Sequence, residues 1–497
     1  MAWLPGFVAA CVSISISLIV WWIRLPKNLP SGPWTWPLLG SLPNVGISLY
    51  RSGLQPHQFM AQLTKHYGKV YSFYLGNQLL VILNSAESVR EAFKNQCLAD
   101  RPKVHIPDRL KGEHGTGEGV VMASGESWSQ QRRFTLSTFR SFGVGKRSFQ
   151  DQISVEVQAL CEEISTLEGE SFDPRKLLTN AVTNIICTVI IGKRFEYSDK
   201  SFHDLLQLYD RQQKAAGSGL ADSLIPILRF LKISSKSDEE RYQNNQQLGK
   251  FYNDILSDHR KAFDPTDLKD YIDVYLDEIN KTEDSSSSIN PNNLMATIHQ
   301  LFSAGAGTTI TTLRWSLLYM MAYPEIQRRI QREIDDVVGR NRLPDYSDKE
   351  HLPYTEATLM EIARIASIAP FGIPHVAAQN TTLFGYNIPE KTIIMSNIWA
   401  IHNDPDTWKD PDMFRPERFL DGDRLVKQPD AYLPFSAGRR VCLGENLARM
   451  ELFLFFSHFL HRFTYKKPQD SPELSFDGVA GAANSPRFYE TEAILRE

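Results

Sequence analysis

Hydrophobic residues recur every three to four positions through most of the segment 84–339, and this period predicts a largely helical body. Ahead of that segment, two short apolar runs at 70–75 and 78–83 flank a Gly-Asn dipeptide, an arrangement typical of a β-hairpin. A second group of strand-like runs lies within 382–397. The pattern therefore predicts a mainly α fold with minor β-sheets.

The N-terminal segment 1–23 contains no charged side chain, and its length is close to the ~20 apolar residues that a membrane-spanning helix needs. Trp21 and Trp22 stand at its end, and Arg24 and Lys27 follow at once. Because basic residues stay on the cytosolic side of a membrane, we expect a transmembrane anchor with the rest of the chain in the cytosol. The alternative, a cleaved signal peptide, lacks a basic start and a small-residue cleavage site.

The rest of the chain is expected to comprise a short linker and one domain. Residues 24–48 are basic and proline-rich, which predicts a stiff, extended linker. No Pro/Gly/Ser-rich boundary or internal repeat divides 49–497. The formal net charge of −4 does not indicate nucleic-acid binding. An odd number of scattered cysteines argues against a disulfide framework and for a reducing compartment: Cys11, Cys97, Cys161, Cys187 and Cys442.

A cysteine near the C-terminus stands in a loop with unusual neighbours: Phe435, Gly438, Arg440, Cys442 and Gly444. A thiolate that binds haem iron needs a short, dry loop, and glycine allows the close approach and the unusual dihedral angles that such a loop requires. The arginine supplies a positive charge for a haem propionate, and the phenylalanine an apolar cover. The alternative is a buried structural cysteine in a glycine-bearing turn.

This loop resembles the cysteine-loop signature of the cytochrome P-450 family, F-x-x-G-x-R-x-C-x-G, at every fixed position. Three more motifs agree: Glu361 and Arg364 one turn apart on a predicted helix, Arg418 within Pro-Glu-Arg-Phe, and Trp128 four residues before Arg132. In the family the Glu–Arg–Arg trio is buried behind the haem, and the tryptophan and arginine reach the propionates. The resemblance thus implies the cytochrome P-450 fold, with 49–497 as a haem-thiolate catalytic domain.

The sequences of segments 142–147, 179–184 and 444–453 resemble those of the microsomal family-two clan. Within the clan, they are most similar to the vitamin D hydroxylase and long-chain fatty-acid hydroxylase branches. This resemblance implies haem b as the cofactor, with Cys442 as the iron ligand. It also implies a single-pass protein of the endoplasmic reticulum membrane whose catalytic domain is cytosolic.

A predicted helix at about 293–321 contains Ala-Gly-Ala-Gly-Thr-Thr at 304–309. Each mid-helix glycine costs about 1 kcal/mol relative to alanine, which predicts a face that a flat group approaches. The family has Ala-Gly-x-acid-Thr-Thr here, and its threonine opens the helix and assists oxygen activation. Thr308 stands at the threonine position and is the expected catalytic residue. Gly307 replaces the acid, so we expect protons to arrive through a water chain.

The resemblance also places a substrate pocket and a second propionate ligand. The pocket residues are apolar, which predicts a lipophilic substrate such as a fatty acid, a sterol or secosteroid, or a xenobiotic: Phe302, Ala304, Ile368, Ala369, Phe371 and Ile373. His375 is expected at a propionate. The same residues would equally suit an ordinary hydrophobic core.

Electrons must come from a partner, because the chain shows no flavin or nicotinamide fingerprint. We expect NADPH–cytochrome P-450 reductase, with cytochrome b5 as a further partner. A basic cluster suits an acidic flavoprotein, although a solvated face is the alternative: Arg132, Arg133, Arg140, Lys146 and Arg147.

The leading hypothesis is a membrane-anchored haem-thiolate monooxygenase. A hydroperoxide isomerase or dehydratase would need neither reductase nor acid, so Gly307 favours it and Thr308 argues against it. A non-catalytic haem- or steroid-binding protein is the remaining alternative.

Overall fold

The computed structural model describes residues 26–103, 118–224, 235–282, 287–479, 481 and 483–496. The expected anchor, 1–23, lies outside these ranges. None of the described helices combines the length and the apolar character needed to cross a bilayer.

Helices dominate the described residues, as predicted. The α-helices are α2 (Leu42–Ser52), α3 (Pro56–Tyr67), α4 (Ala86–Lys94), α5 (Gly119–Met122), α6 (Gly125–Ser141), α7 (Gln150–Ser165), α8 (Pro174–Ile191), α9 (Lys200–Leu224), α11 (Ser235–Ala262), α12 (Tyr271–Lys281), α13 (Pro291–Ala322), α14 (Pro324–Val337), α15 (Pro353–Ala366), α16 (Ile398–His402) and α17 (Glu445–Arg462).

The strands are short. They are β1 (Val70–Leu75), β2 (Gln78–Leu83), β3 (His375–Val376), β4 (Thr381–Leu383), β5 (Tyr386–Ile388), β6 (Ile393–Ser396), β7 (Leu420–Asp421), β8 (Arg424–Leu425), β9 (Phe463–Lys466), β10 (Gly478–Val479), β11 (Ser485–Pro486) and β12 (Glu492–Leu495).

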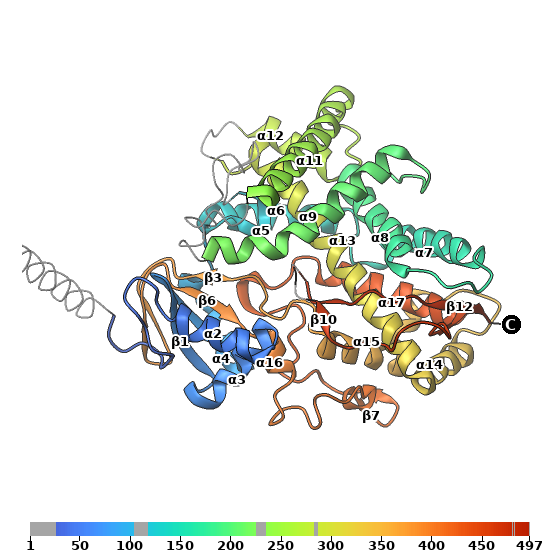
Figure 1. The fold of residues 1–497 in the computed structure, drawn as a ribbon. Helices are drawn as coiled ribbons and strands as arrows, with labels where there is room; N and C mark the ends of the chain where they lie inside the picture. Colours follow the sequence, from blue (N-terminus) through green and yellow to red (C-terminus); the bar gives the residue numbers. More distant parts are fainter. Residues whose placement is uncertain are drawn as a thin grey trace, which may run out of the picture.

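Helix α13 runs through the middle of the helical body, between a layer with α9, α11 and α12 and a layer with α14, α15 and α17 (Figure 1). It begins where the Asn290 side chain accepts the Asn293 N–H and Pro291 occupies the first turn, a strong start signal. The largest apolar cluster joins α13 to α7, α8, α12 and α17. The central helix is thus fixed on several sides, which positions the residues on its remaining open face.

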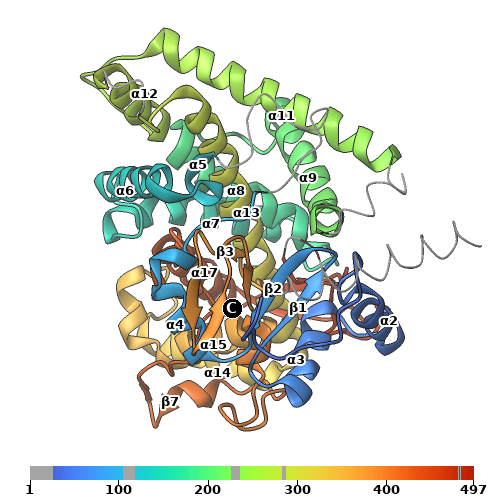
Figure 2. The same cartoon turned by 90° about the vertical axis from the view of Figure 1, so that its left-hand side faces the viewer.

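A four-stranded sheet with the order β1-β2-β6-β3 lies at one side of the helical body, next to α2, α3 and α4 (Figures 1 and 2). The predicted hairpin is confirmed, because β1 pairs antiparallel with β2 and Leu75 stands opposite Gln78. The second predicted strand group is also present, as β4, β5 and β6. Helix α4 begins after Ser85, whose hydroxyl accepts the Ser88 N–H.

The segment expected to be a stiff, extended linker forms hydrogen bonds with the domain. The Asn387 N–H donates to Asn28 O at 2.9 Å, and the Ser72 N–H donates to Ser31 O at 2.9 Å. Helix α2 begins at Leu42, inside the range 24–48 that the sequence assigns to a linker. Proline stiffness alone did not indicate these contacts, because their partners lie far away in the sequence.

Candidate active site

The cysteine loop presents an accessible thiol. It leads from the 3-10 turn Gly438–Arg440 into α17, and the Cys442 N–H donates to Phe435 O at 3.1 Å. Burial among protein atoms raises the pKa of the Cys442 thiol, whereas a hydrogen bond from the Gly444 N–H to the sulfur lowers it. The side chain is nevertheless accessible to solvent. Burial outweighs the bond from Gly444, so the pKa of the free thiol is raised on balance. The N–H aimed at the sulfur still stabilises the thiolate, which is the form that binds metal.

The two glycines of the loop serve different purposes. Gly438 has φ +75°, and a Cβ there would lie 2.2 Å from Phe93 O, so both dihedral angle and packing require glycine. The expectation of an unusual dihedral angle is wrong for Gly444, because its φ is −90°. Apart from its neighbours in the chain, no described residue would lie within 4 Å of a Cβ at Gly444. Its small size therefore leaves space beside the thiol.

Three arginines converge next to this loop. Arg440 and Arg101 both donate to Val121 O, each at 3.3 Å, and Arg132 donates to Val441 O at 2.7 Å. Burial, followed by repulsion from the neighbouring guanidinium groups, lowers the pKa values of Arg101 and Arg440 to about 9. Within the described part of the chain, no carboxylate lies at ion-pair distance from the three arginines, because the ion pairs there join other residues.

Two aromatic residues complete this positive pocket. The Arg440 guanidinium lies 3.9 Å from the Trp128 ring centroid, and the Trp128 indole N–H is buried without a partner among the described residues. His375 stacks on Phe93 with ring centroids 3.8 Å apart. Burial, then Arg101 and Arg440, lower the pKa of His375 to about 3, so the ring is neutral at pH 7. A donor without an acceptor beside unpaired guanidinium groups suits an anion.

The expected Glu–Arg–Arg trio is present and buried. Glu361 accepts Arg364 Nε at 2.7 Å and Nη2 at 2.8 Å, and it accepts Arg418 Nε at 2.9 Å. The Glu361 and Arg364 side chains have no exposed surface. Arg364 also donates to His402 O at 2.7 Å and to Pro411 O at 2.8 Å. The trio ties α15 to the segment that precedes the cysteine loop.

Helix α13 differs in two ways from what the family resemblance implies. It is continuous through Thr308, whose hydroxyl donates to Ala304 O at 2.7 Å, so the threonine does not open the helix. This bond to the carbonyl four residues back leaves the main-chain ladder intact. A Cβ at Gly305 would lie 2.6 Å from Ile186 Cδ1, so this glycine allows α8 to approach and is not a haem-facing gap.

The expected pocket residues separate into two groups. Ala304, Thr308 and Ile373 are exposed although they belong to interior segments, and they therefore border an opening. Phe302 is 2% exposed with its ring 5.8 Å from that of Tyr252, so it lies in the core.

The loop after α15 contains the other expected pocket residues. Phe371 packs against the cluster beneath the four-stranded sheet, whereas Ile368 packs at the edge of the main core. Ala369 is partly buried between them. Sequence reasoning missed the β10–β11 segment, where the Asn484 N–H donates to Ile368 O at 2.8 Å. Two-residue strands leave no periodic signal, so the sequence could not indicate this neighbour.

The basic cluster forms a groove along α6 of about 390 Å³, lined by Trp128, Ser129, Arg132, Arg133, Leu136, Ser137 and Arg140. Arg133 and Arg140 are exposed there. Lys146 instead donates to Arg140 O at 3.1 Å, and Arg147 lies 3.7 Å from Asp345. Both residues are exposed as well, so the exposed positive charge extends from α6 past its C-terminal end.

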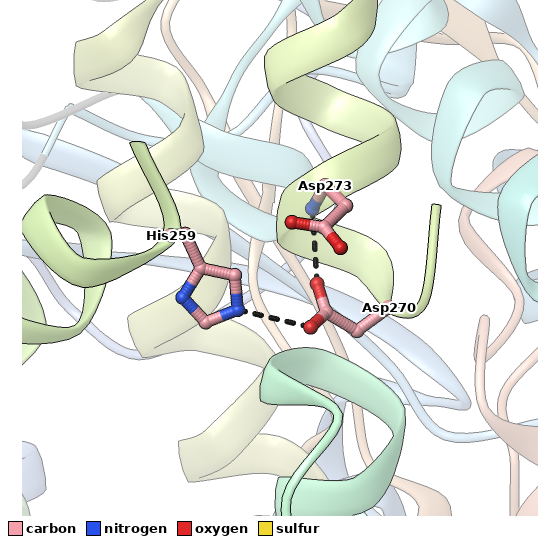
Figure 3. A group of neighbouring side chains, drawn as sticks. All are labelled: His259, Asp270 and Asp273. Carbon is pink, nitrogen blue, oxygen red and sulfur yellow. Dashed lines mark hydrogen bonds and ion pairs between the residues drawn. The ribbon is translucent and has the colours of Figure 1, made fainter. Parts of the chain in front are cut away.

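A second group of metal-ligand side chains joins α11 to α12 (Figure 3). Asp270 caps α12 by accepting the Asp273 N–H at 2.9 Å, and its other oxygen lies 2.9 Å from His259 Nε2. Burial lowers the pKa of His259, but the hydrogen bonds to Asp270 and to Ile255 O raise it by more. The pKa of His259 is therefore raised on balance. A cap and an ion pair account for this group, and we assign it a structural role.

Comparison with known proteins agrees with the site. The cytochrome P450 family model matches residues 30–491. The chain is 39% identical to cytochrome P450 2J3 of Rattus norvegicus over 476 residues, which are 95% of this chain and 92% of the relative. It is 38% identical to cytochrome P450 2J2 of Homo sapiens, with the same two coverages, and 36% identical to human cytochrome P450 2U1, with coverages of 95% and 90%.

The chain belongs to the cytochrome P450 family. It is therefore an oxidoreductase, a haem-thiolate monooxygenase, whose cofactor is haem b. The placement in the family-two clan is confirmed by the relatives. The narrower likeness to the vitamin D and long-chain fatty-acid hydroxylase branches stays a prediction.

The residues of this P450 fit haem. Haem is a flat iron porphyrin with two carboxylates. The accessible thiol, the space beside Gly444 and the guanidinium groups without an ion-pair partner suit this shape and charge. Arg101 belongs to this set, and sequence reasoning missed it. A lone arginine followed by proline carries no signal, and only folding brings it to Val121 O beside Arg440.

Proposed function

We propose that this P450 hydroxylates a lipophilic small molecule with O2 and with electrons from NADPH, delivered by NADPH–cytochrome P-450 reductase. The observation that supports the site assignment best is the accessible Cys442 thiol, which accepts the Gly444 N–H beside unpaired arginines. Bound through a thiolate, haem supplies an oxidant that attacks C–H bonds. Arg101, Arg132, Arg440 and the Trp128 N–H would hold the propionates.

The chain's own residues shape the substrate side. Ala304 leaves room above the central helix, and Ile373 offers an apolar surface that is 46% exposed. The Thr308 hydroxyl donates to the helix at rest, so its oxygen is free to accept a proton-bearing group. The small and apolar side chains of Ala304 and Ile373 favour a lipophilic substrate, such as a fatty acid, a sterol or secosteroid, or a xenobiotic.

Reconstituted turnover tests this proposal. Full-length protein with the reductase and NADPH should oxidise at least one member of a panel of fatty acids, sterols, secosteroids and xenobiotics. Cys442→Ala should abolish both the product and the carbon-monoxide difference band that names the family. Product that needs only an organic hydroperoxide would contradict the proposal and support an isomerase or dehydratase.

The groove on α6 is the proposed docking surface for the reductase, and cytochrome b5 would use the same exposed charge. Arg133→Glu with Arg140→Glu should raise the reductase concentration needed for half-maximal rate and weaken its dependence on salt. Arg328→Glu, on the exposed side of α14, is the matched control. Equal reductase titrations for both variants would contradict this surface.

We also propose a single-pass protein of the endoplasmic reticulum membrane with the division 1–23, 24–48 and 49–497. Exposed apolar residues in 34–50 continue the apolar N-terminus and support contact with lipid: Trp34, Trp36, Leu38, Ile47 and Tyr50, of which Leu38 and Tyr50 are 86% and 88% exposed. Deletion of 1–23 should release much of the protein from microsomes, and Leu38→Asp with Tyr50→Asp should release the remainder. Unchanged sedimentation after both changes would contradict the proposal.

A further inference from the structure

Helix α13 lacks the acid that its position calls for. Gly307 stands where the family has a carboxylate, and the helix sequence from Pro291 to Ala322 contains neither Asp nor Glu. The Thr308 hydroxyl proton is engaged with Ala304 O at 2.7 Å. The monooxygenase reaction nevertheless consumes two protons with each pair of electrons, so this chain must take them from another group.

A neutral acid of another helix contacts the next residue of α13, Thr309. Glu451 of α17 is 1% exposed, and its Oε2 accepts the Thr309 hydroxyl at 2.9 Å. Its Oε1 is buried and has no partner among the described residues. Burial raises the pKa of Glu451 to about 8, and the bond from Thr309 only partly offsets this. At pH 7 the carboxyl therefore keeps its proton, as a buried acid that donates must.

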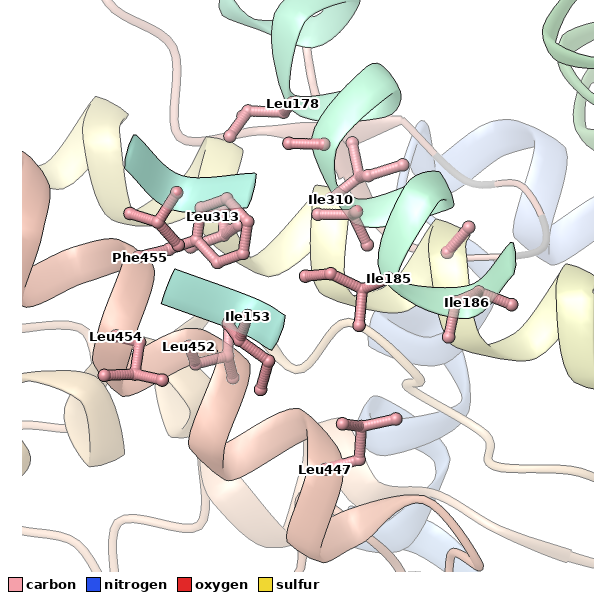
Figure 4. Close-up of a cluster of buried hydrophobic side chains, with 14 of the residues drawn as sticks. Ile153, Leu178, Ile185, Ile186, Ile310, Leu313, Leu447, Leu452, Leu454 and Phe455 are labelled. Carbon is pink, nitrogen blue, oxygen red and sulfur yellow. The ribbon is translucent and has the colours of Figure 1, made fainter. Parts of the chain in front are cut away.

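The surroundings explain why this acid is neutral. The junction of α7, α8, α13 and α17 is filled with aliphatic side chains, among them Ile310 and Leu313 of α13 and Leu447 and Leu452 of α17 (Figure 4). No charged group contributes to the pKa of Glu451. Thr309 is thus its one polar contact in the described structure.

The position of Glu451 connects the two sides of the site. Helix α17 starts three residues after the thiol-bearing Cys442, and it packs against α13. Thr309 follows directly after Thr308, which borders the opening. The hydrogen bond between Thr309 and Glu451 therefore joins the helix of the iron ligand to the helix of the expected catalytic threonine.

We propose that Glu451 supplies a proton for oxygen activation in place of the acid missing at Gly307, an inference that rests on the proposed monooxygenase function. Its Oε1–H gives the proton to a water molecule bound at this unpartnered atom, and the carboxylate regains a proton from solvent, so only O–H bonds break and form. The Thr309 hydroxyl holds the carboxyl in place. A buried carboxyl oxygen without a partner is costly, and a water molecule bound at Oε1 would remove that cost.

Glu451→Gln separates proton supply from structure. Glutamine has nearly the same shape and still accepts the Thr309 hydroxyl, but it cannot give up a proton. We expect product per NADPH to fall roughly 10-fold, the low part of the range for lost acid–base assistance, with a matching rise in peroxide release. Haem content should not change. Glu325→Gln, on the exposed start of α14, is the control.

Two further measurements make the result decisive. Gly307→Glu added to Glu451→Gln should restore coupling, because it returns a carboxyl to the family position. In resting protein without substrate or NADPH, the infrared C=O band of a protonated carboxyl should vanish in Glu451→Gln and shift in Thr309→Val. The band should titrate near pH 8.

The outcomes separate this inference from the proposed function. If the unmodified enzyme forms product and Glu451→Gln couples equally well, Glu451 is only structural and the inference fails. Persistence of the infrared band in Glu451→Gln would overturn it as well. If the unmodified enzyme forms no product with reductase on any substrate, the proposed function fails, and this inference fails with it.

Discussion

Two buried arginine clusters of this P450 differ in the source of their counter-charge. Around Glu361, one carboxylate accepts Arg364 and Arg418 within 2.9 Å. Around Arg440, the guanidinium groups are satisfied by backbone carbonyls, and burial with mutual repulsion lowers the pKa of Arg101 as well. The first cluster has a carboxylate of the chain as its counter-charge, whereas no described carboxylate forms an ion pair with the second. We therefore expect the first cluster to stabilise the fold and the second to hold the carboxylates of the cofactor.

Each cluster also contains a tryptophan, and the contrast repeats there. The Arg364 guanidinium lies 5.4 Å from the ring of Trp408, whose indole N–H donates to Ile401 O at 3.0 Å. The Arg440 guanidinium lies 3.9 Å from the ring of Trp128, whose indole N–H has no partner among the described residues. An unpaired donor in a buried site needs an explanation, and an anion held by the neighbouring arginines would provide one.

The largest expected effect comes from Glu361→Ala. Removing the carboxylate leaves two buried guanidinium groups without a counter-charge, which costs about 3–5 kcal/mol. We expect little soluble protein, and urea unfolding of what remains should show a loss of this size. Glu417→Gln, which breaks the half-exposed pair with Arg329, should cost no more than about 1 kcal/mol. Similar losses in both variants would remove the basis of the comparison.

Arg440→Met should act on the cofactor more than on the fold. Losing a charge-assisted hydrogen bond costs about 1.5–3 kcal/mol, so transfer of haem to apomyoglobin should be roughly 10- to 100-fold faster. Arg439→Met changes the exposed neighbour in the same turn and should leave the transfer rate unchanged. If Arg440→Met lowers stability as much as Glu361→Ala without accelerating haem loss, the two clusters do not differ in kind.

The two clusters also differ in how far the sequence reveals them. The Glu361 trio and the Cys442 loop follow short motifs, because a helical i, i+3 pair and a tight glycine turn fix their geometry locally. Arg101 has no such motif, since its place depends on contacts with Val121 and Ile373. Local spacing therefore predicts the iron side of the site, whereas the anion side needs the folded chain.

The fold shows the same limit. Periodicity was sufficient for the β1–β2 hairpin and for α13, since each is an uninterrupted pattern. It could not show that Gly305 serves the approach of Ile186, because a helical glycine looks the same whether it faces a cofactor or a second helix. It also could not show that Gly444 has an ordinary φ.

The tryptophan pair offers a smaller test. Trp128→Phe removes the unpaired donor but keeps an aromatic face for Arg440, so haem transfer should accelerate only about 2- to 10-fold, as expected for a net hydrogen bond of about 0.5–1.5 kcal/mol. Unfolding of the protein should change little. Trp408→Phe should show the reverse, because it leaves Ile401 O without its donor and does not touch the cofactor. Faster haem transfer in Trp408→Phe would contradict the division of roles.

The smallest expected effect is the loss of folding stability as the pH falls. Burial, then Arg364, lower the pKa of His402 to about 3, and burial, then Arg101 and Arg440, do the same for His375. A histidine whose pKa is depressed in the folded state contributes stability above its unfolded pKa of about 6.5, and this is lost as the pH falls. From pH 7 to pH 6 the loss is about 0.7 kcal/mol for each such group.

Propionates would offset the two arginines next to His375 but not the one next to His402, so bound haem should raise the pKa of His375 alone. In the haem-loaded enzyme, His402→Gln should therefore remove more of the stability lost between pH 7 and pH 6 than His375→Gln does, as measured by urea unfolding at both values. Gln suits position 402 because its amide oxygen can replace Nε2 as the acceptor of the Leu433 N–H. A larger share removed by His375→Gln than by His402→Gln would show that no anion compensates the Arg101–Arg440 cluster.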